Sequence, residues 1–278
     1  PYESTAISFD MKKSNLGLGT YLLHTSAGSG NYNATYFTLS GGYDYKFKSK
    51  PHHHIATGLQ LGGIFKSINS NILTFEDQYD PANGGSFMNS TNETFGATSV
   101  FLPEINAGIM YYYTNTNSRI NPFFGASFQH LSQPDESLLN YVSKLPIKYN
   151  FQPGIKVHLN SKFQFLLHGL GMFQKNVNEI MISWMGYYNV EKSGTCYSFG
   201  ITRRTNDDAV IAHLGLMHKK LQYRISYDVN TSNLQSISNG RGGFEFSIIF
   251  INSKINPNPF RSCPDLKNIV YILYLVLS

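Results

Sequence analysis

Apolar and polar side chains alternate along most of this chain. In residues 221–229, Tyr223, Ile225, Tyr227 and Val229 occupy every second position. A period of two places one set of side chains on each face of a β-strand. Here one face is apolar, and the other is polar and charged. Such a strand fits half of a soluble sandwich, or one strand of a membrane barrel with lipid outside and water inside.

The same pattern predicts thirteen strands in an antiparallel meander, with no helical period between them. The predicted strands are residues 4–12, 16–24, 34–48, 55–68, 104–113, 121–129, 149–159, 163–173, 179–189, 194–202, 209–217, 221–229 and 242–250. Alternate connections differ in length: turns such as 13–15 and 160–162 are short, whereas 69–103 and 130–148 are long. Short turns on one rim and long loops on the other are typical of an outer-membrane barrel. The sequence therefore predicts an all-β, antiparallel up-and-down transmembrane barrel.

The strand count and the two ends of the chain carry further expectations. Single-chain bacterial barrels usually have an even number of strands, so we expect about 14 strands in the full protein and about 13 here. The first strand and a signal peptide are then expected before Pro1. Residues 1–252 are assigned to the barrel, and residues 253–278 to a periplasmic tail with an atypical apolar end.

The apolar end of the tail, IVYILYLVL at residues 269–277, is too short to span a bilayer as a helix. It fits an aggregation-prone strand, a segment at the lipid surface, or the product of an altered reading frame. The last of these is preferred, and no function is predicted for the segment.

Composition agrees with a membrane barrel. Charged residues make up 14% of the chain, against about a quarter in soluble proteins. The net charge of +5 is spread without a dense basic tract, so no nucleic-acid partner is expected. Two cysteines are too few for a disulfide scaffold or a cysteine metal framework.

Three candidate chemistries have simpler explanations. His52, His53 and His54 are consecutive and point to alternate sides of an extended chain, so a periplasmic turn is preferred over a metal site. Glu76, Asp77 and Asp80 could offer oxygens to Ca²⁺, but their spacing is not that of a calcium loop. We expect no metal and no cofactor. Some outer-membrane barrels are phospholipases with a Ser nucleophile and a His base; because no G-x-S-x-G motif is present, we expect no enzyme activity.

Charges on the last strands are expected to face the lumen. Arg224 and Asp228 share one face of a strand, and Glu245 lies on the polar face of the final strand. Charges facing lipid would cost about 2–4 kcal/mol each near the midplane. Inside the barrel they either line an aqueous pore or form a network that plugs it. Structural salt bridges are preferred over a selectivity filter.

Several short motifs occur along the chain: FEDQYDP at 75–81, HLSQPDESL at 130–138, LP at 145–146, GITRRTNDDA at 200–209, SYDVNTSNL at 226–234 and GRGGFEFSI at 240–248. Together, and in this order, they resemble the PorP/SprF family over about residues 16–264. They supply the candidate residues for loop shape and partner contact, which are Phe75, Asp77, Asp80, Pro81, His130, Pro134, Arg203, Arg204 and Asp208. Two departures are that the NPAYAGS-like start is absent and that the chain continues beyond Pro264.

The resemblance implies an outer-membrane barrel that acts as an accessory component of the type IX secretion system of Bacteroidota. Some family members support gliding motility by helping to export a surface adhesin. The implied partners are the translocon, periplasmic secretion components, an exported cargo protein and outer-membrane lipid. An outer-membrane channel or transporter for small solutes or lipids is the alternative, and a soluble β-sandwich lectin is a third possibility. The family provides no catalytic or ligand-binding residues.

Overall fold

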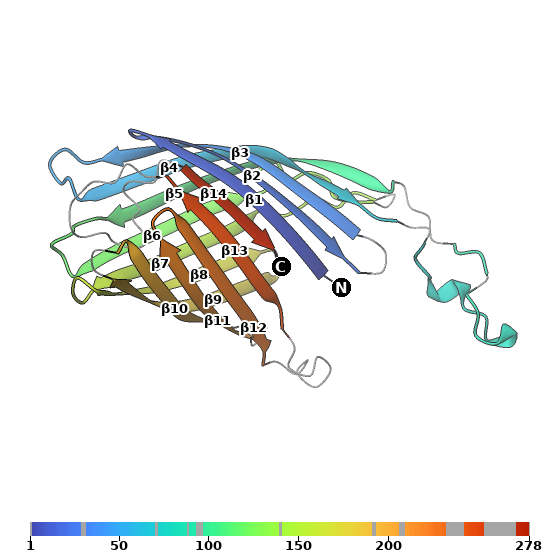
Figure 1. Ribbon diagram of the computed structural model, residues 1–278. Coiled ribbons are helices and arrows are strands. Elements are labelled where there is room, and N and C mark those ends of the chain that lie inside the picture. Colours follow the sequence, from blue (N-terminus) through green and yellow to red (C-terminus); the bar gives the residue numbers. More distant parts are fainter. Residues whose placement is uncertain are drawn as a thin grey trace.

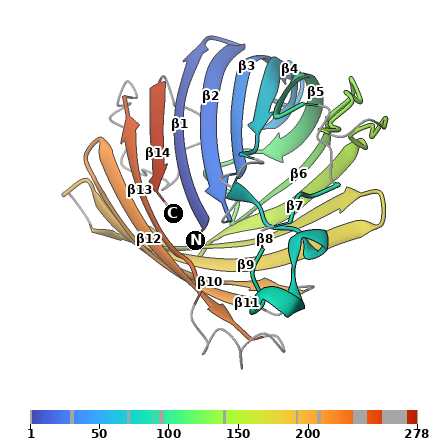
Figure 2. The same cartoon turned by 90° about the vertical axis from the view of Figure 1, so that its right-hand side faces the viewer.

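The computed structural model describes residues 2–28, 32–69, 72–87, 89–92, 97–138, 141–190, 193–205, 209–231, 242–252 and 271–277. In these residues the strands close into one antiparallel barrel (Figures 1 and 2). The strands are β1 (Tyr2–Lys13), β2 (Leu16–Ala27), β3 (Tyr32–Lys46), β4 (His53–Ser67), β5 (Ser99–Tyr113), β6 (Ile120–Gln129), β7 (Lys148–His158), β8 (Phe163–Gln174), β9 (Val177–Val190), β10 (Thr195–Arg204), β11 (Ala209–His218), β12 (Leu221–Asn230), β13 (Phe244–Ile251) and β14 (Tyr271–Leu277). The predicted all-β barrel is confirmed.

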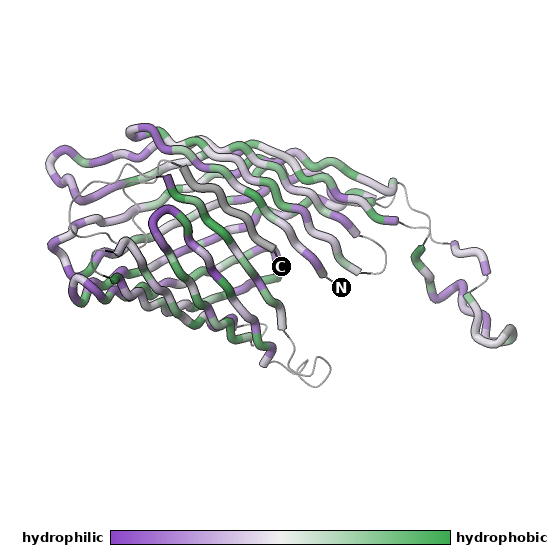
Figure 3. Tube along the Cα trace, in the orientation of Figure 1, coloured by the Kyte–Doolittle hydropathy of each residue, from purple (hydrophilic) through white to green (hydrophobic). Residues whose placement is uncertain are grey.

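The outer face of the barrel is apolar and the inner face is largely small or polar. Leu59 and Leu61 on β4 are 63% and 59% exposed, while Gln60 between them faces the lumen. Hydrophobic and hydrophilic residues alternate along the strands, and hydrophilic residues gather at the turns (Figure 3). Large apolar side chains are stable in this position because they contact lipid rather than water. Within the described residues, no helix is long and apolar enough to cross a membrane.

The two rims of the barrel differ. One rim carries tight turns, among them residues 14–15 and 219–220, and the other carries the connections 68–98 and 130–147 (Figure 1). The connection between β8 and β9 lies on the second rim and is nevertheless a tight turn, with Lys175 at a positive φ of 51°. Among the connections that the structure describes over most of their length, the long ones on this rim are β4–β5 and β6–β7.

β5 begins earlier than the sequence predicts. Pro103 was expected to end a long loop, but the strand starts at Ser99 and Pro103 pairs with Gly63 of β4. β6 pairs with β5 only over Ala107–Tyr112. In the described part of the chain, residues 99–106 of β5 have no strand on the β6 side. Proline is tolerated on such an edge because no backbone donor is required there.

β14 is the second difference. Residues 271–277 were assigned to a periplasmic tail, but they form a strand between β1 and β13, antiparallel to both. A meander of thirteen strands would bring β1 and β13 together in parallel, whereas a fourteenth strand keeps every pair antiparallel. Closure also removes two open edges, which are unfavourable in lipid. The rest of the expected tail, 253–270, lies outside the described residues.

The lumen holds a cavity of about 800 Å³. Its wall includes Gly17, Gly42, Gly58, Gly108 and Gly125, on strands β2 to β6. Two small apolar clusters also lie on the inner wall: Met185, Tyr187 and Cys196, and Ile64, Leu102 and Leu145. The apolar side chains that are buried among the described residues thus form separate small clusters, and the cavity lies beside a wall of small residues.

Candidate functional site

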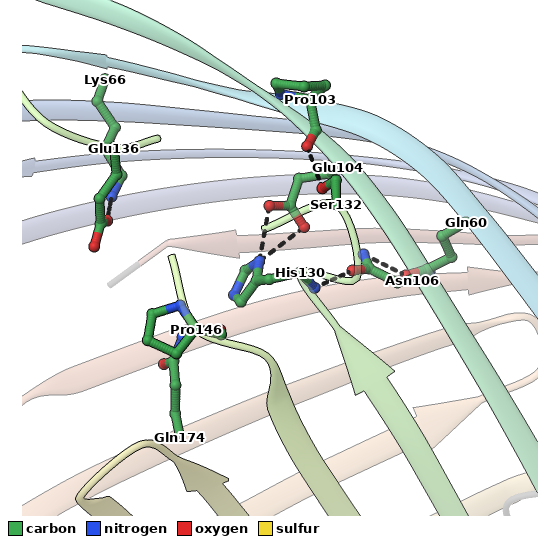
Figure 4. Close-up of polar contacts among 10 residues, drawn as sticks. All are labelled: Gln60, Lys66, Pro103, Glu104, Asn106, His130, Ser132, Glu136, Pro146 and Gln174. Atoms are coloured by element: carbon green, nitrogen blue, oxygen red, sulfur yellow. Dashed lines mark hydrogen bonds and ion pairs between the residues drawn. The ribbon is translucent and has the colours of Figure 1, made fainter. Parts of the chain in front are cut away.

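The β6–β7 loop, residues 130–147, turns inward from the end of β6 and is held by the inner face of β5. His130 lies at a positive φ of 59°, and its Nδ1 is 2.7 Å from Oε1 and 2.8 Å from Oε2 of Glu104. Its backbone N–H donates to Oδ1 of Asn106 at 2.9 Å (Figure 4). Glu104 is only 4% exposed. A buried carboxylate needs such a partner, so this contact fixes the start of the loop.

The anchor continues across the wall as a chain of hydrogen bonds. Asn106 donates through Nδ2 to Oε1 of Gln60 at 3.4 Å, and Gln60 donates through Nε2 to Oγ of Ser40 at 2.9 Å. These side chains come from β5, β4 and β3 and all face the lumen. The first turn of the loop is therefore tied to three neighbouring strands.

The same loop also seals the free edge of β5. The backbone N–H of Leu131 donates to the carbonyl of Ile105 at 2.9 Å, and the Ser132 hydroxyl donates to the carbonyl of Pro103 at 2.6 Å (Figure 4). Both carbonyls would otherwise lie on an open strand edge in the barrel wall. The loop thus takes the place that β6 leaves empty.

The second half of the loop is fixed by packing and charge. Leu145 packs against Ile64 and Leu102, and its N–H donates to the carbonyl of Pro134 at 2.9 Å. Nζ of Lys66 is 2.6 Å from Oε2 of Glu136. On the other side, Gln174 of β8 donates to the carbonyl of Pro146 at 2.9 Å (Figure 4). The loop therefore lies along the inner wall at this rim, in contact with β4 and β5 on one side and with β8 on the other.

The β4–β5 loop folds by itself beyond the same rim (Figure 1). It contains two short 3₁₀ helices, η2 (Glu76–Gln78) and η3 (Pro81–Asn83). Asp77 accepts from Oγ1 of Thr91 at 3.0 Å and from the N–H of Asn92 at 2.6 Å. Asp80 caps η3 by accepting from the N–H of Ala82 at 2.9 Å. Phe75 and Pro81 stand at the starts of η2 and η3.

The carboxylates of this loop are used in folding it. Within the described residues, no group of three His, Cys, Asp or Glu side chains is arranged to hold a metal ion. The loop also exposes large apolar side chains: Ile72, Tyr79 and Phe87 are 47–49% exposed, and the ring centroids of Tyr79 and Phe87 are 5.3 Å apart. The loop is thus a preformed knob that carries exposed aromatic side chains.

The rim arginines separate to the two sides of the wall. Arg203 and Arg204 are the last residues of β10 and not part of a loop. Arg204 faces the lumen, with its Nε 2.9 Å from Oε1 of Glu179 and its Nη1 3.7 Å from Oδ2 of Asp228. Arg203 is exposed on the opposite face. Asp208 lies outside the described residues.

The remaining predicted lumen charges, Arg224 and Glu245, occupy inward positions on β12 and β13. The structure therefore brings Arg204 and Asp228 together but leaves Arg224 without an ion pair among the described residues.

In the run of histidines at 52–54, His53 and His54 point to opposite faces of β4, as the alternation predicts. Nδ1 of His54 is 3.1 Å from Oδ1 of Asp44 in the lumen, and Oδ2 of Asp44 is 2.7 Å from Nζ of Lys12. His53 instead forms a 2.8 Å hydrogen bond with the Tyr111 hydroxyl. These contacts place the histidines at the short-turn rim as structural residues.

The main residues that sequence reasoning missed are Glu104, Asn106 and Lys66, which hold the β6–β7 loop. A signal was present, because Leu102, Glu104 and Asn106 alternate in the same way as the other strands. Pro103 concealed it by suggesting a loop at that place.

The comparisons with known proteins place these features in a family. The family model described as the type IX secretion system membrane protein PorP/SprF matches residues 2–250. No protein among the curated sequences matches significantly.

Several solved barrels share remote similarity. The CymD monoaromatic hydrocarbon channel is 9% identical, covers 99% of this chain and 86% of its own, and has a TM-score of 0.40. A TodX ΔS2S3 mutant monoaromatic hydrocarbon channel is 8% identical, covers 99% of this chain and 88% of its own, and has a TM-score of 0.38. OccK3 (OpdO) of Pseudomonas aeruginosa is 11% identical, covers 99% of this chain and 94% of its own, and has a TM-score of 0.36. At these TM-scores the similarities add nothing to the description of the site.

Proposed function

This chain belongs to the PorP/SprF family of type IX secretion system membrane proteins, and we propose that it supports export or surface attachment of cargo proteins by binding partner proteins. The family is a membrane-protein family, and a closed barrel with an apolar outer face belongs to the outer membrane. The finer proposal is that the long-loop rim is the binding surface. It involves no catalytic step of its own.

The observation that carries this proposal is the preformed β4–β5 knob. Asp77 and Asp80 hold its backbone through hydrogen bonds within the loop. A loop that is already ordered loses less conformational entropy when a partner binds. Exposed Tyr79 and Phe87 supply the aromatic surface that is enriched at the centres of protein interfaces.

The β6–β7 loop supports docking over free passage. Its contacts with Glu104, Lys66 and Gln174 hold it against the inner wall at the long-loop rim, where it narrows the opening. A loop fixed at both ends restricts what can enter the lumen from that rim. It also adds exposed Tyr141 and Val142 to the same surface.

The proposed partners follow the two rims and the outer wall. The exported cargo protein, such as a gliding adhesin of Bacteroidota, contacts the long-loop rim. The translocon contacts the same rim or the barrel wall, and periplasmic secretion components contact the short-turn rim. Outer-membrane lipid contacts the apolar outer face. No nucleic acid takes part.

A second candidate function, a channel for small solutes or lipids, rests on a different observation. The lumen retains a cavity of about 800 Å³ beside a wall of glycines, a volume within the usual range for small-ligand sites. Planar-bilayer recordings separate the two functions. Large steady conductance from the wild-type barrel favours a channel, and a silent barrel favours docking.

The test of the proposed function is a deletion of the gene in the source bacterium, followed by quantification of secreted and surface proteins. Loss of one or a few exported proteins is expected, with recovery when the wild-type gene is restored. A variant with residues 72–92 replaced by a Gly/Ser linker should not restore export. A control with the short turn 160–162 replaced by Gly and Ser should restore it. An unchanged surface proteome after deletion would sink the proposal.

A further inference from the structure

Arg224 is a strongly basic lumen side chain whose charge is not matched within the part of the chain that the structure describes. Arg224 faces inward from the middle of β12 and forms no ion pair or hydrogen bond with the residues that the structure describes. Its Nε is shielded from solvent and has no partner there. Arginine remains protonated under all ordinary conditions. A guanidinium shielded from water and not paired with an acid is unfavourable unless another anion neutralises its charge.

A second group at the same place is also incomplete. Ser247 lies directly across from Arg224 on β13 and faces the lumen. It is only 1% exposed, and its hydroxyl has no partner among the described residues. Side chains directly opposite each other on one face of an antiparallel pair have Cβ atoms about 5 Å apart. A donor and a cation thus lie side by side, both unsatisfied.

Two histidines also lie near Arg224 on the inner wall. Arg224 is close enough for its charge to act on the rings of both His168 and His213. His213 is held through its Nε2, which is 2.9 Å from Oγ1 of Thr202. Thr202 in turn is 2.7 Å from the hydroxyl of Ser183. The ring of His213 is therefore held by a hydroxyl of the wall, whereas Nδ1 of His168 is shielded from solvent and has no hydrogen-bond partner among the described residues.

The nearby acids do not neutralise Arg224. Asp228, further along β12, lies 3.7 Å from Arg204. Glu245 is on β13 beside Ser247, and it forms no ion pair with Arg224 in the described part of the chain. Gly215 stands opposite Arg224 on β11, and a Cβ there would collide with the Ser198 hydroxyl. The residues directly opposite Arg224 on the neighbouring strands, Gly215 and Ser247, are thus small. Neither Asp228 nor Glu245 forms an ion pair with Arg224 in the described part of the chain.

We propose that Arg224 and Ser247, with His168 and His213 beside them, form an oxyanion-binding site in the barrel lumen. The ligand is a carboxylate or a phosphate group. The guanidinium fork matches the paired oxygens of either group, and the serine hydroxyl donates a further hydrogen bond. Such an oxyanion has two sources: a small free anion, or the C-terminal carboxylate of a polypeptide. This site does not depend on the secretion role.

The test is isothermal titration calorimetry of the purified barrel in detergent at constant ionic strength. The probes are inorganic phosphate and a short alanine peptide, either with a free C-terminal carboxylate or as the C-terminal amide. Saturable binding is expected for phosphate, for the free-acid peptide, or for both, and not for the amide. A much tighter free-acid peptide identifies a chain end as the source, and equal or tighter phosphate identifies a small anion.

Variants locate the site. R224Q is expected to weaken binding tenfold or more, and S247A several-fold. K148Q removes a lysine from the lumen wall elsewhere and should leave binding unchanged. Heat-modifiable gel migration reports whether each variant folds. If R224Q does not fold, the effect of S247A on binding tests the site. No saturable binding to the wild type, binding that Arg224 and Ser247 do not affect, or equal binding of the amide would overturn the site.

Discussion

The acidic residues that hold the two long loops, Glu104 of β5 and Asp77 of the β4–β5 loop, act through their hydrogen bonds. Glu104 is buried and held by His130, and Asp77 accepts bonds from Thr91 and Asn92. In each case a carboxylate ties together segments that are far apart in sequence. Their removal should loosen one loop and leave the barrel intact.

Glu104→Ala should release the β6–β7 loop. The change removes a charge-assisted hydrogen bond, which contributes about 1.5–3 kcal/mol. Trypsin cleavage after the exposed Lys144 should then become roughly tenfold faster. Glu179→Ala is the control, because Glu179 pairs with Arg204 elsewhere on the wall. Equal cleavage rates for the wild type and Glu104→Ala would show that His130 does not hold the loop.

Asp77→Ala should open the β4–β5 knob without affecting the barrel. Losing the two acceptor contacts should destabilise the loop by about 0.5–2 kcal/mol, the range for a lost capping group. Hydrogen exchange in residues 72–92 should become several-fold faster, while β4 and β5 exchange as before. Glu76→Ala, at the exposed neighbouring position, is the matched control. Unchanged exchange in Asp77→Ala would contradict the proposed role of the carboxylate.

At the scale of elements, the strands could be predicted because lipid and water impose opposite requirements on neighbouring residues. Each predicted strand contains enough alternating positions to fix its face, so Arg224 and Asp228 could be assigned to the lumen. Boundaries failed where a local signal competed with pairing. Pro103 suggested a loop, although the absence of β6 beside it makes proline acceptable.

Long-range contacts were not predictable from alternation. Nothing in HLSQPDESL indicates that His130 meets Glu104, because that contact depends on how far β5 rises above β6. The position of β14 between β1 and β13 likewise depends on closure of the whole sheet. Unpartnered Arg224 and Ser247 could be recognised only once β12 and β13 were in register.

The alternation itself can be tested on single strands. Leu39→Lys places a charge on the lipid face of β3 and should destabilise the barrel in lipid vesicles by about 2–4 kcal/mol. Gly125→Lys places the same charge in the lumen, where a Cβ meets no atom closer than 3.7 Å, and should have little effect. Leu39→Met controls for loss of the leucine. Urea unfolding measures all three, and equal losses for the two lysine variants would contradict the assigned faces.

For the molecule as a whole, the decisive question is how far the β6–β7 loop closes the lumen. The barrel supplies a cavity of about 800 Å³, and the loop lies against its inner wall between β5 and β8 at the long-loop rim. Replacing residues 131–146 with a short Gly/Ser linker should keep β6 and β7 paired, because their register runs from 120–129 to 148–157. Single-barrel conductance should then rise several-fold over the wild type, because the obstruction at the mouth is removed.

A matched control for this experiment replaces the short turn 160–162 at the opposite rim, which should leave conductance unchanged. Equal conductance for the loop variant and the wild type would mean that the lumen is closed elsewhere, or was open from the start. The same variant separates the two roles of the rim. If the loop only closes the lumen, export should persist while conductance rises; if it also contacts the cargo, both should change together.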